Sequence, residues 1–146
     1  MSRKLSFIVV AGFLLYAGLS RFGPNIFHTS VESLGSSDQE LASAFESHRS
    51  GFQVTGEGEV TRILPDDNEG GRHQRFIIRL GTGQTLLIAH NIDLAPRINA
   101  LRVDDSVMFS GEYEWNLQGG VIHWTHHDPA GHHIDGWIKH GGQSYQ

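Results

Sequence analysis

The chain has 146 residues, which is room for one domain, and it contains no cysteine, so disulfides and thiolate chemistry are excluded. Its 11 basic residues stand against 16 acidic ones, giving a formal net charge of -5 with neutral histidines. Nucleic-acid binding depends largely on neutralising phosphates with Lys and Arg. The charge balance therefore argues against a nucleic-acid partner.

The N-terminus has the pattern of an export signal. Arg3 and Lys4 precede an uncharged run from Leu5 to Leu19 that is rich in Leu, Ile, Val and Phe. Such a run is shorter than a membrane span of about 20 residues but fits the core of a signal peptide. We expect residues 1–20 to be a signal peptide or a retained inner-membrane anchor. The protein would then be periplasmic or secreted, and would contact a membrane only through this segment if uncleaved.

A linker and one helix are expected next. Residues 21–36 are rich in Gly, Pro, Asn and Ser, which is typical of a linker, and a single domain is expected over 37–146. Ser37 and Glu40 fit a capping box. The positions that share one helical face behind it are Leu41, Ala44, Phe45 and His48. This pattern predicts a short amphipathic helix over about 38–49.

From residue 52 onward the apolar residues recur with a period of two, which indicates half-buried strands. The predicted strands cover residues 52–64, 73–80, 86–89, 107–116 and 121–127, with a short helix or 3₁₀ turn at 93–98. The fold class is thus mostly β. A Gly-rich meander of this kind favours a small five-stranded barrel of the oligonucleotide/oligosaccharide-binding (OB) type, with a small sandwich or an open sheet as alternatives.

The fourth and fifth predicted strands can be aligned with each other. A turn over 117–120 joins them, and we expect Asn116 to pair with Val121. The resulting pairs are Trp115 with Ile122, Tyr113 with Trp124, and Glu114 with His123. Because side chains alternate between faces, the first two pairs are predicted to face the interior and the third to face solvent.

Several longer motifs resemble a known family. They are Leu64 to Gly70, His73 to Ile77, Ala89 to Arg97, Gly111 to Asn116, Gly120 to Pro129 and Gly136 to His140. Together they resemble the bacterial family called domain of unknown function 3465, over about residues 50–146. The resemblance implies a small bacterial protein, often with an export signal and with no established activity.

The segment 121–133 holds five of the ten histidines, and His140 follows it. Neutral imidazole is the commonest protein ligand for transition metals. The candidate metal ligands are His123, His127, Asp128 and His133, assisted by a carboxylate of Glu112 or Glu114. A divalent ion such as zinc would suit these nitrogen and oxygen donors, although the spacing matches no established zinc motif. The alternatives are histidines that hydrogen-bond structurally, or adventitious metal binding at His132 and His140.

Two further groups are candidate sites. Glu114 beside His123 is a candidate acid–base pair, or else an ordinary cross-strand pair on a solvated face. The residues expected near one barrel mouth are His73, Arg75, His90, Asn91 and Arg97. They would suit an anionic or sugar-like ligand, and the alternative is that they form salt bridges to nearby carboxylates.

These features support three hypotheses from different classes. The first is an exported barrel that binds a small ligand or a divalent metal through its His-rich region. The second is a metal-dependent hydrolase acting on phosphoesters, which rests on analogy of fold. The third is a structural envelope protein that contacts other proteins. Because no nucleophile motif is present, the sequence favours a binding domain over an enzyme.

Overall fold

The structure, a computed structural model, describes residues 25–146. The expected signal or anchor segment, residues 1–20, lies outside the described residues. Within the described part of the chain, no helix has the length and apolar character needed to cross a membrane.

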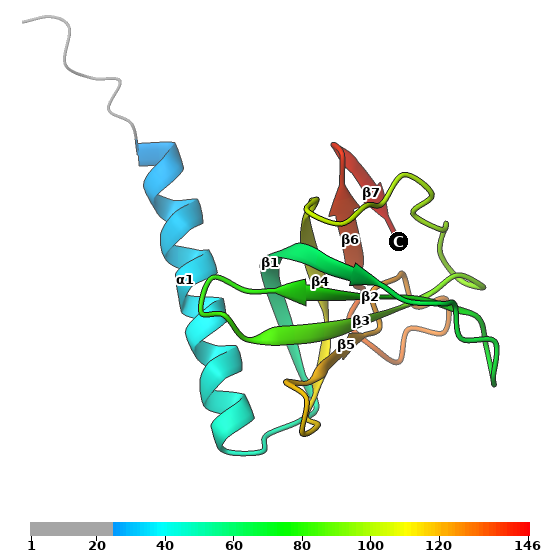
Figure 1. Cartoon of the computed structure of the whole chain (residues 1–146), viewed down its shortest axis with the longest axis horizontal. Coiled ribbons are helices and arrows are strands. Elements are labelled where there is room, and N and C mark those ends of the chain that lie inside the picture. Colours follow the sequence, from blue (N-terminus) through cyan, green and yellow to red (C-terminus); the bar gives the residue numbers. More distant parts are fainter. Residues whose placement is uncertain (1–24) are drawn as a thin grey trace, which may run out of the picture.

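A single long helix precedes the strands. Helix α1 spans Asn25–Glu46, and its last turns pack against the barrel while its first turns extend beyond it (Figure 1). Leu41 and Ala44 are fully buried in that contact. Residues 25–36 of the predicted linker thus form the first turns of this helix. Helix propagation adds one hydrogen bond per residue once a turn is anchored, so the chain tolerates the roughly 1 kcal/mol cost of a glycine such as Gly35.

Seven strands follow within the described residues. They are β1 (Phe52–Ile63), β2 (His73–Arg79), β3 (Thr85–Asn91), β4 (Ser106–Glu114), β5 (Val121–His123), β6 (Trp137–His140) and β7 (Gln143–Tyr145). Their order is β1-β2-β3-β5-β4, and β4 pairs with β1 to close the ring. The predicted five-stranded barrel of the OB type is confirmed. Strands β6 and β7, which were not among the predicted strands, form a hairpin that is added along β4.

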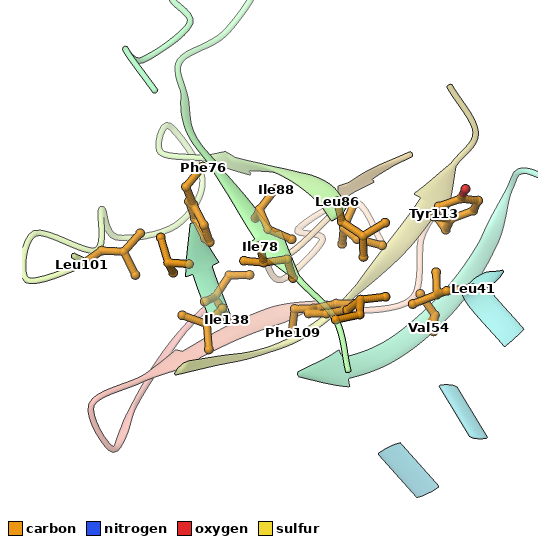
Figure 2. Packing of buried hydrophobic residues seen from close by; sticks show 14 of the residues in the cluster. Leu41, Val54, Phe76, Ile78, Leu86, Ile88, Leu101, Phe109, Tyr113 and Ile138 are labelled. Carbon is orange, nitrogen blue, oxygen red and sulfur yellow. The ribbon is translucent and has the colours of Figure 1, made fainter. Parts of the chain in front are cut away.

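The barrel interior is filled by hydrophobic side chains that point inward from the strands (Figure 2). The large buried side chains include Phe76, Ile78, Leu86, Ile88, Phe109, Tyr113, Ile122 and Ile138. Gly56 also faces inward, and a Cβ placed there would lie 2.6 Å from Cζ of Phe109. The glycine thus leaves the space that the phenylalanine ring occupies.

The pairing of β4 with β5 differs from the prediction by two residues. The observed pairs are Glu112 with His123, Tyr113 with Ile122, and Glu114 with Val121. The side chains still point to the predicted faces, because a shift of two residues keeps every side chain on its side of the sheet. Asn116 causes the shift, because its side-chain oxygen accepts hydrogen bonds from the backbone N–H groups of Gln118 and Gly120. This turn joins Glu114 to Val121 rather than Asn116 to Val121.

Two other local predictions differ from the structure in part. Strand β5 ends at His123, and Trp124 has a left-handed backbone with φ of 53°, so it does not face Tyr113 inside the barrel. Where a short helix or 3₁₀ turn was predicted over 93–98, the chain makes a turn at 92–94 and then runs without regular structure through 96–98. The hydrogen bond from the Ala95 N–H to the Asn91 carbonyl has the spacing of one helical turn, but the helix does not continue.

Candidate functional site

Three titratable side chains meet on the outer face of the barrel. Glu112 and Glu114 extend from β4, and His123 extends from the neighbouring β5. Nε2 of His123 lies 3.7 Å from Oε1 of Glu112 and 3.9 Å from Oε1 of Glu114. Atoms from all three residues lie within 4.8 Å of one another. We call these three residues the β4–β5 acidic site.

The imidazole of His123 is held in an unusual electrostatic setting. Its Nε2 atom is buried and makes no hydrogen bond, although 33% of the side chain is exposed through other atoms. Burial lowers the pKa of His123, while the negative charges of Glu112 and Glu114 act in the opposite direction. Burial has the larger effect, so the ring stays neutral near pH 7 and keeps a lone pair available for a ligand.

The spacing suits a small cation better than it suits direct hydrogen bonds. A hydrogen bond between these atoms would need about 2.7–3.2 Å, which is shorter than either observed separation. Tetrahedral ligands placed about 2.1 Å from a zinc ion lie about 3.4 Å apart, which is close to the observed separations. The predicted acid–base pair of Glu114 and His123 therefore lacks a direct hydrogen bond, and Glu112 is the closer carboxylate.

His133 lies at the edge of this site. Its Nδ1 is 3.7 Å from Oε2 of Glu112. The imidazole stacks on the indole of Trp124, with ring centroids 3.6 Å apart and an interplanar angle of 19°. Trp124 also contacts the ring of His126, at a centroid distance of 5.4 Å. The left-handed backbone of Trp124 turns the chain out of β5 and sets its indole beside the acidic site.

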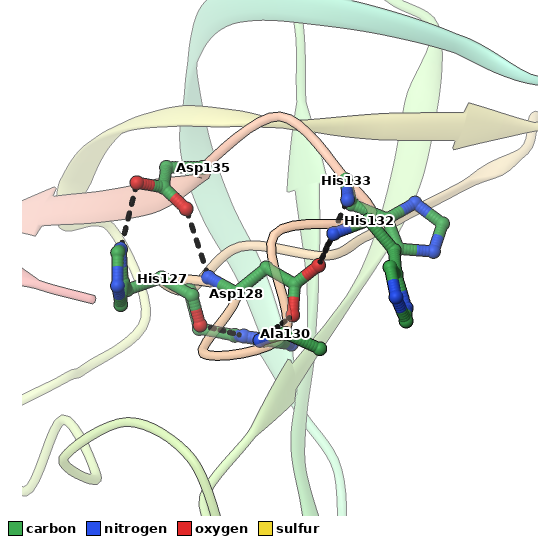
Figure 3. Close-up of polar contacts among 7 residues, drawn as sticks. His127, Asp128, Ala130, His132, His133 and Asp135 are labelled. Atoms are coloured by element: carbon green, nitrogen blue, oxygen red, sulfur yellow. Dashed lines mark hydrogen bonds and ion pairs between the residues drawn. The ribbon is translucent and has the colours of Figure 1, made fainter.

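His127 and Asp128, the other two predicted metal ligands, have different partners (Figure 3). Nδ1 of His127 donates a hydrogen bond to Oδ2 of Asp135 at 2.7 Å. The carboxylate of Asp128 accepts hydrogen bonds from the backbone N–H groups of Ala130, His132 and His133. These bonds lower the pKa of Asp128 to about 2. The structure thus brings His123 and His133 together and leaves His127 and Asp128 in the adjoining loop.

The predicted ligand-binding residues other than His90 form ion pairs or hydrogen bonds with residues of nearby loops. Arg97 pairs with Asp66 at 3.2 Å. Arg75 donates from Nε to the Pro65 carbonyl at 3.1 Å. The remaining two contacts are the Asn91 side-chain oxygen with the Asp93 N–H, and Nδ1 of His73 with the Gly71 carbonyl. These contacts support the structural alternative for these residues, and ligand binding there stays a prediction.

His90 belongs to the interior rather than to a barrel mouth. Its side chain is fully buried. Nε2 lies 3.1 Å from the Pro96 carbonyl, so it must carry the proton, and Nδ1 then accepts from the Thr125 hydroxyl at 2.8 Å. Burial lowers the pKa of His90 to about 4, which keeps the ring neutral at pH 7. The period-two pattern contained this information, because His90 shares a strand face with Leu86 and Ile88.

Two contributors to the site were not predicted from the sequence. The stack of Trp124 on His133 depends on a chain reversal that the pattern of residues does not reveal. Asp135 closes the loop by accepting the Asp128 N–H, and its other carboxylate oxygen accepts a hydrogen bond from His127. The role of Asp135 could have been predicted from its place just after the His-rich segment, since Asp side chains commonly accept backbone hydrogen bonds in turns.

The fold and the site define a small closed β-barrel that carries an outward-facing group of two carboxylates and a histidine. The family described as protein of unknown function (DUF3465) matches residues 26–146, and the chain belongs to that family. A search of curated proteins found no match.

Proposed function

We propose that this protein is an exported binding domain that holds a divalent metal ion, such as zinc, at the β4–β5 acidic site. The ligands would be Glu112, Glu114 and His123, and the fourth position would be left for water or for a bound ligand. The observation that carries the proposal is the buried Nε2 of His123, which lacks a hydrogen bond and lies within 4 Å of two carboxylates. A cation at that point would give this nitrogen a partner and neutralise both charges.

The supporting framework is rigid. Glu112 is paired with His123 across two adjacent strands, so the backbone fixes their separation. Metal sites built on strands hold their geometry better than sites on loops. The depressed pKa of His123 also favours binding near neutral pH, because a metal competes with a proton for the same lone pair.

Calorimetric titration of the tag-free protein with zinc chloride tests the proposal. We expect saturable binding of one ion per chain. His123→Ala and the isosteric Glu112→Gln should remove this binding, because each deletes a ligand. The ion should also stabilise the fold, by about 2.7 kcal/mol at a hundredfold excess over the dissociation constant.

His132→Ala is the matched control, since His132 is an exposed histidine of the neighbouring loop. This variant should bind zinc as the wild type does. Absence of saturable binding in the wild type would rule out the proposed site. The same conclusion would follow if His132→Ala abolished binding while His123→Ala left it intact.

A further inference from the structure

We infer that Asp128 is a positioning residue for the β4–β5 acidic site, acting through His133. Its carboxylate holds the loop from Trp124 to Gly136 in a conformation that places the His133 imidazole beside Glu112. The functional part of this inference rests on the proposed metal site. The structural part, the placement of His133, can be measured without any ion.

The contacts of Asp128 account for the shape of the loop (Figure 3). One carboxylate oxygen accepts the N–H groups of His132 and His133, at 2.6 and 2.8 Å, and the other accepts the N–H of Ala130 at 2.9 Å. A backbone bond from Gly131 N–H to the Asp128 carbonyl closes the same turn. Three charge-assisted bonds, from Ala130, His132 and His133, fix the loop backbone up to and including His133.

The far side of the loop is anchored independently. Asp135 accepts the N–H of Asp128 at 2.8 Å, and Gly136 donates its N–H to the His126 carbonyl at 2.9 Å. The loop is therefore closed at its base by contacts that do not involve the Asp128 side chain. Removing that side chain should release the His132–His133 segment without detaching β6 from the barrel.

The fixed backbone sets two contacts of the His133 ring. The ring stacks on Trp124 at 3.6 Å, and its Nδ1 faces Oε2 of Glu112 at 3.7 Å. The other oxygen of Glu112 faces His123. His133 is thus an outer partner of the carboxylate that would bind the ion. Loss of such outer partners typically weakens metal affinity by about 10- to 100-fold.

The experiment compares Asp128→Ala, Asp128→Asn and His127→Ala with the wild type. In the ion-free protein, proton NMR of His133 reports the stack, because the Trp124 ring current shifts the imidazole protons upfield. His133→Ala identifies these signals. Zinc titration by calorimetry then reports affinity, and a thermal melt confirms that each variant is folded.

We expect Asp128→Ala to lose the upfield shift and to bind zinc about tenfold more weakly. Asp128→Asn retains one acceptor oxygen and should be intermediate in both readouts. His127→Ala removes the contact with Asp135 yet should keep the shift and the affinity. If Asp128→Ala does not fold, Asp128→Asn carries the comparison.

A wild-type shift and affinity retained in both Asp128 variants would overturn the inference. Failure of the proposed function looks different: the wild type would not bind zinc, while the loss of the His133 shift would still establish that Asp128 positions the ring. If neither Asp128 variant changes the shift, the positioning role is wrong whatever the zinc result.

Discussion

The Nδ1 atom of His90 accepts a hydrogen bond from the Thr125 hydroxyl at 2.8 Å, inside the barrel. His90 comes from β3, and Thr125 follows β5 by two residues, so the bond ties the start of the Trp124–Gly136 loop to the core. The other ring nitrogen holds the Pro96 carbonyl. A neutral imidazole satisfies both contacts, whereas a buried imidazolium would carry an uncompensated charge.

This arrangement predicts that acid destabilises the fold through His90. Its pKa is about 4 in the folded protein against 6.5 for an ordinary histidine, so the unfolded chain binds the extra proton between these values. Stability should therefore fall as pH drops from about 6.5 to 4, in total by on the order of 3 kcal/mol. Urea unfolding at several pH values measures this. In His90→Gln, which keeps a donor and an acceptor but does not titrate, the slope should be smaller, and an unchanged slope would contradict the prediction.

Gly56 is predicted to be intolerant of a methyl group. In Gly56→Ala the new Cβ would lie 2.6 Å from the Phe109 ring, which is itself fully buried. Overpacking of this kind costs about 1–3 kcal/mol of unfolding free energy. Gly35→Ala is the control, since its Cβ would meet nothing within 4 Å in helix α1, and it should stabilise by up to about 1 kcal/mol. Equal effects in the two variants, measured by urea unfolding, would show that the packing argument is wrong.

The docking of α1 on the barrel should depend on Leu41. This side chain is fully buried in the core cluster, so Leu41→Ala should lower the unfolding free energy by about 2–5 kcal/mol. Gln39→Ala, at an exposed position of the same helix, should change it by less than about 0.5 kcal/mol. Denaturant unfolding followed by circular dichroism compares the two. A Leu41 effect as small as the control would mean that the helix is not part of the cooperative fold.

Export remains a proposal from the sequence. The basic start and the apolar run that follows predict that residues 1–20 carry the domain across the inner membrane. Fusing residues 1–50 to a reporter that is active only outside the cytoplasm should give activity. Replacing Leu14 and Leu15 with arginine should remove it, because charges interrupt the apolar core. An inactive wild-type fusion that is stably expressed would count against export.

The sequence by itself determined which strand faces are buried. The alternation of Val107, Phe109 and Tyr113 with polar residues is a local property of a pleated strand, and the structure buries all three. The five-stranded barrel followed from counting such segments. By the same logic Glu112, Glu114 and His123 were expected on one outer face, and they lie there.

Only the tertiary structure decided how these faces align and where the loops close. The Asn116 turn sets the β4–β5 pairing and thereby makes Glu112, not Glu114, the direct neighbour of His123. The carboxylate of Asp128 accepts hydrogen bonds from backbone N–H groups 2–5 residues further along the chain. From the sequence alone, a metal ion was an equally good partner for it. The physical reason is that the face of a strand on which a side chain lies follows from the alternation of residues next to it in the chain. The hydrogen-bond partner of a polar atom depends instead on turn geometry and on segments distant in sequence.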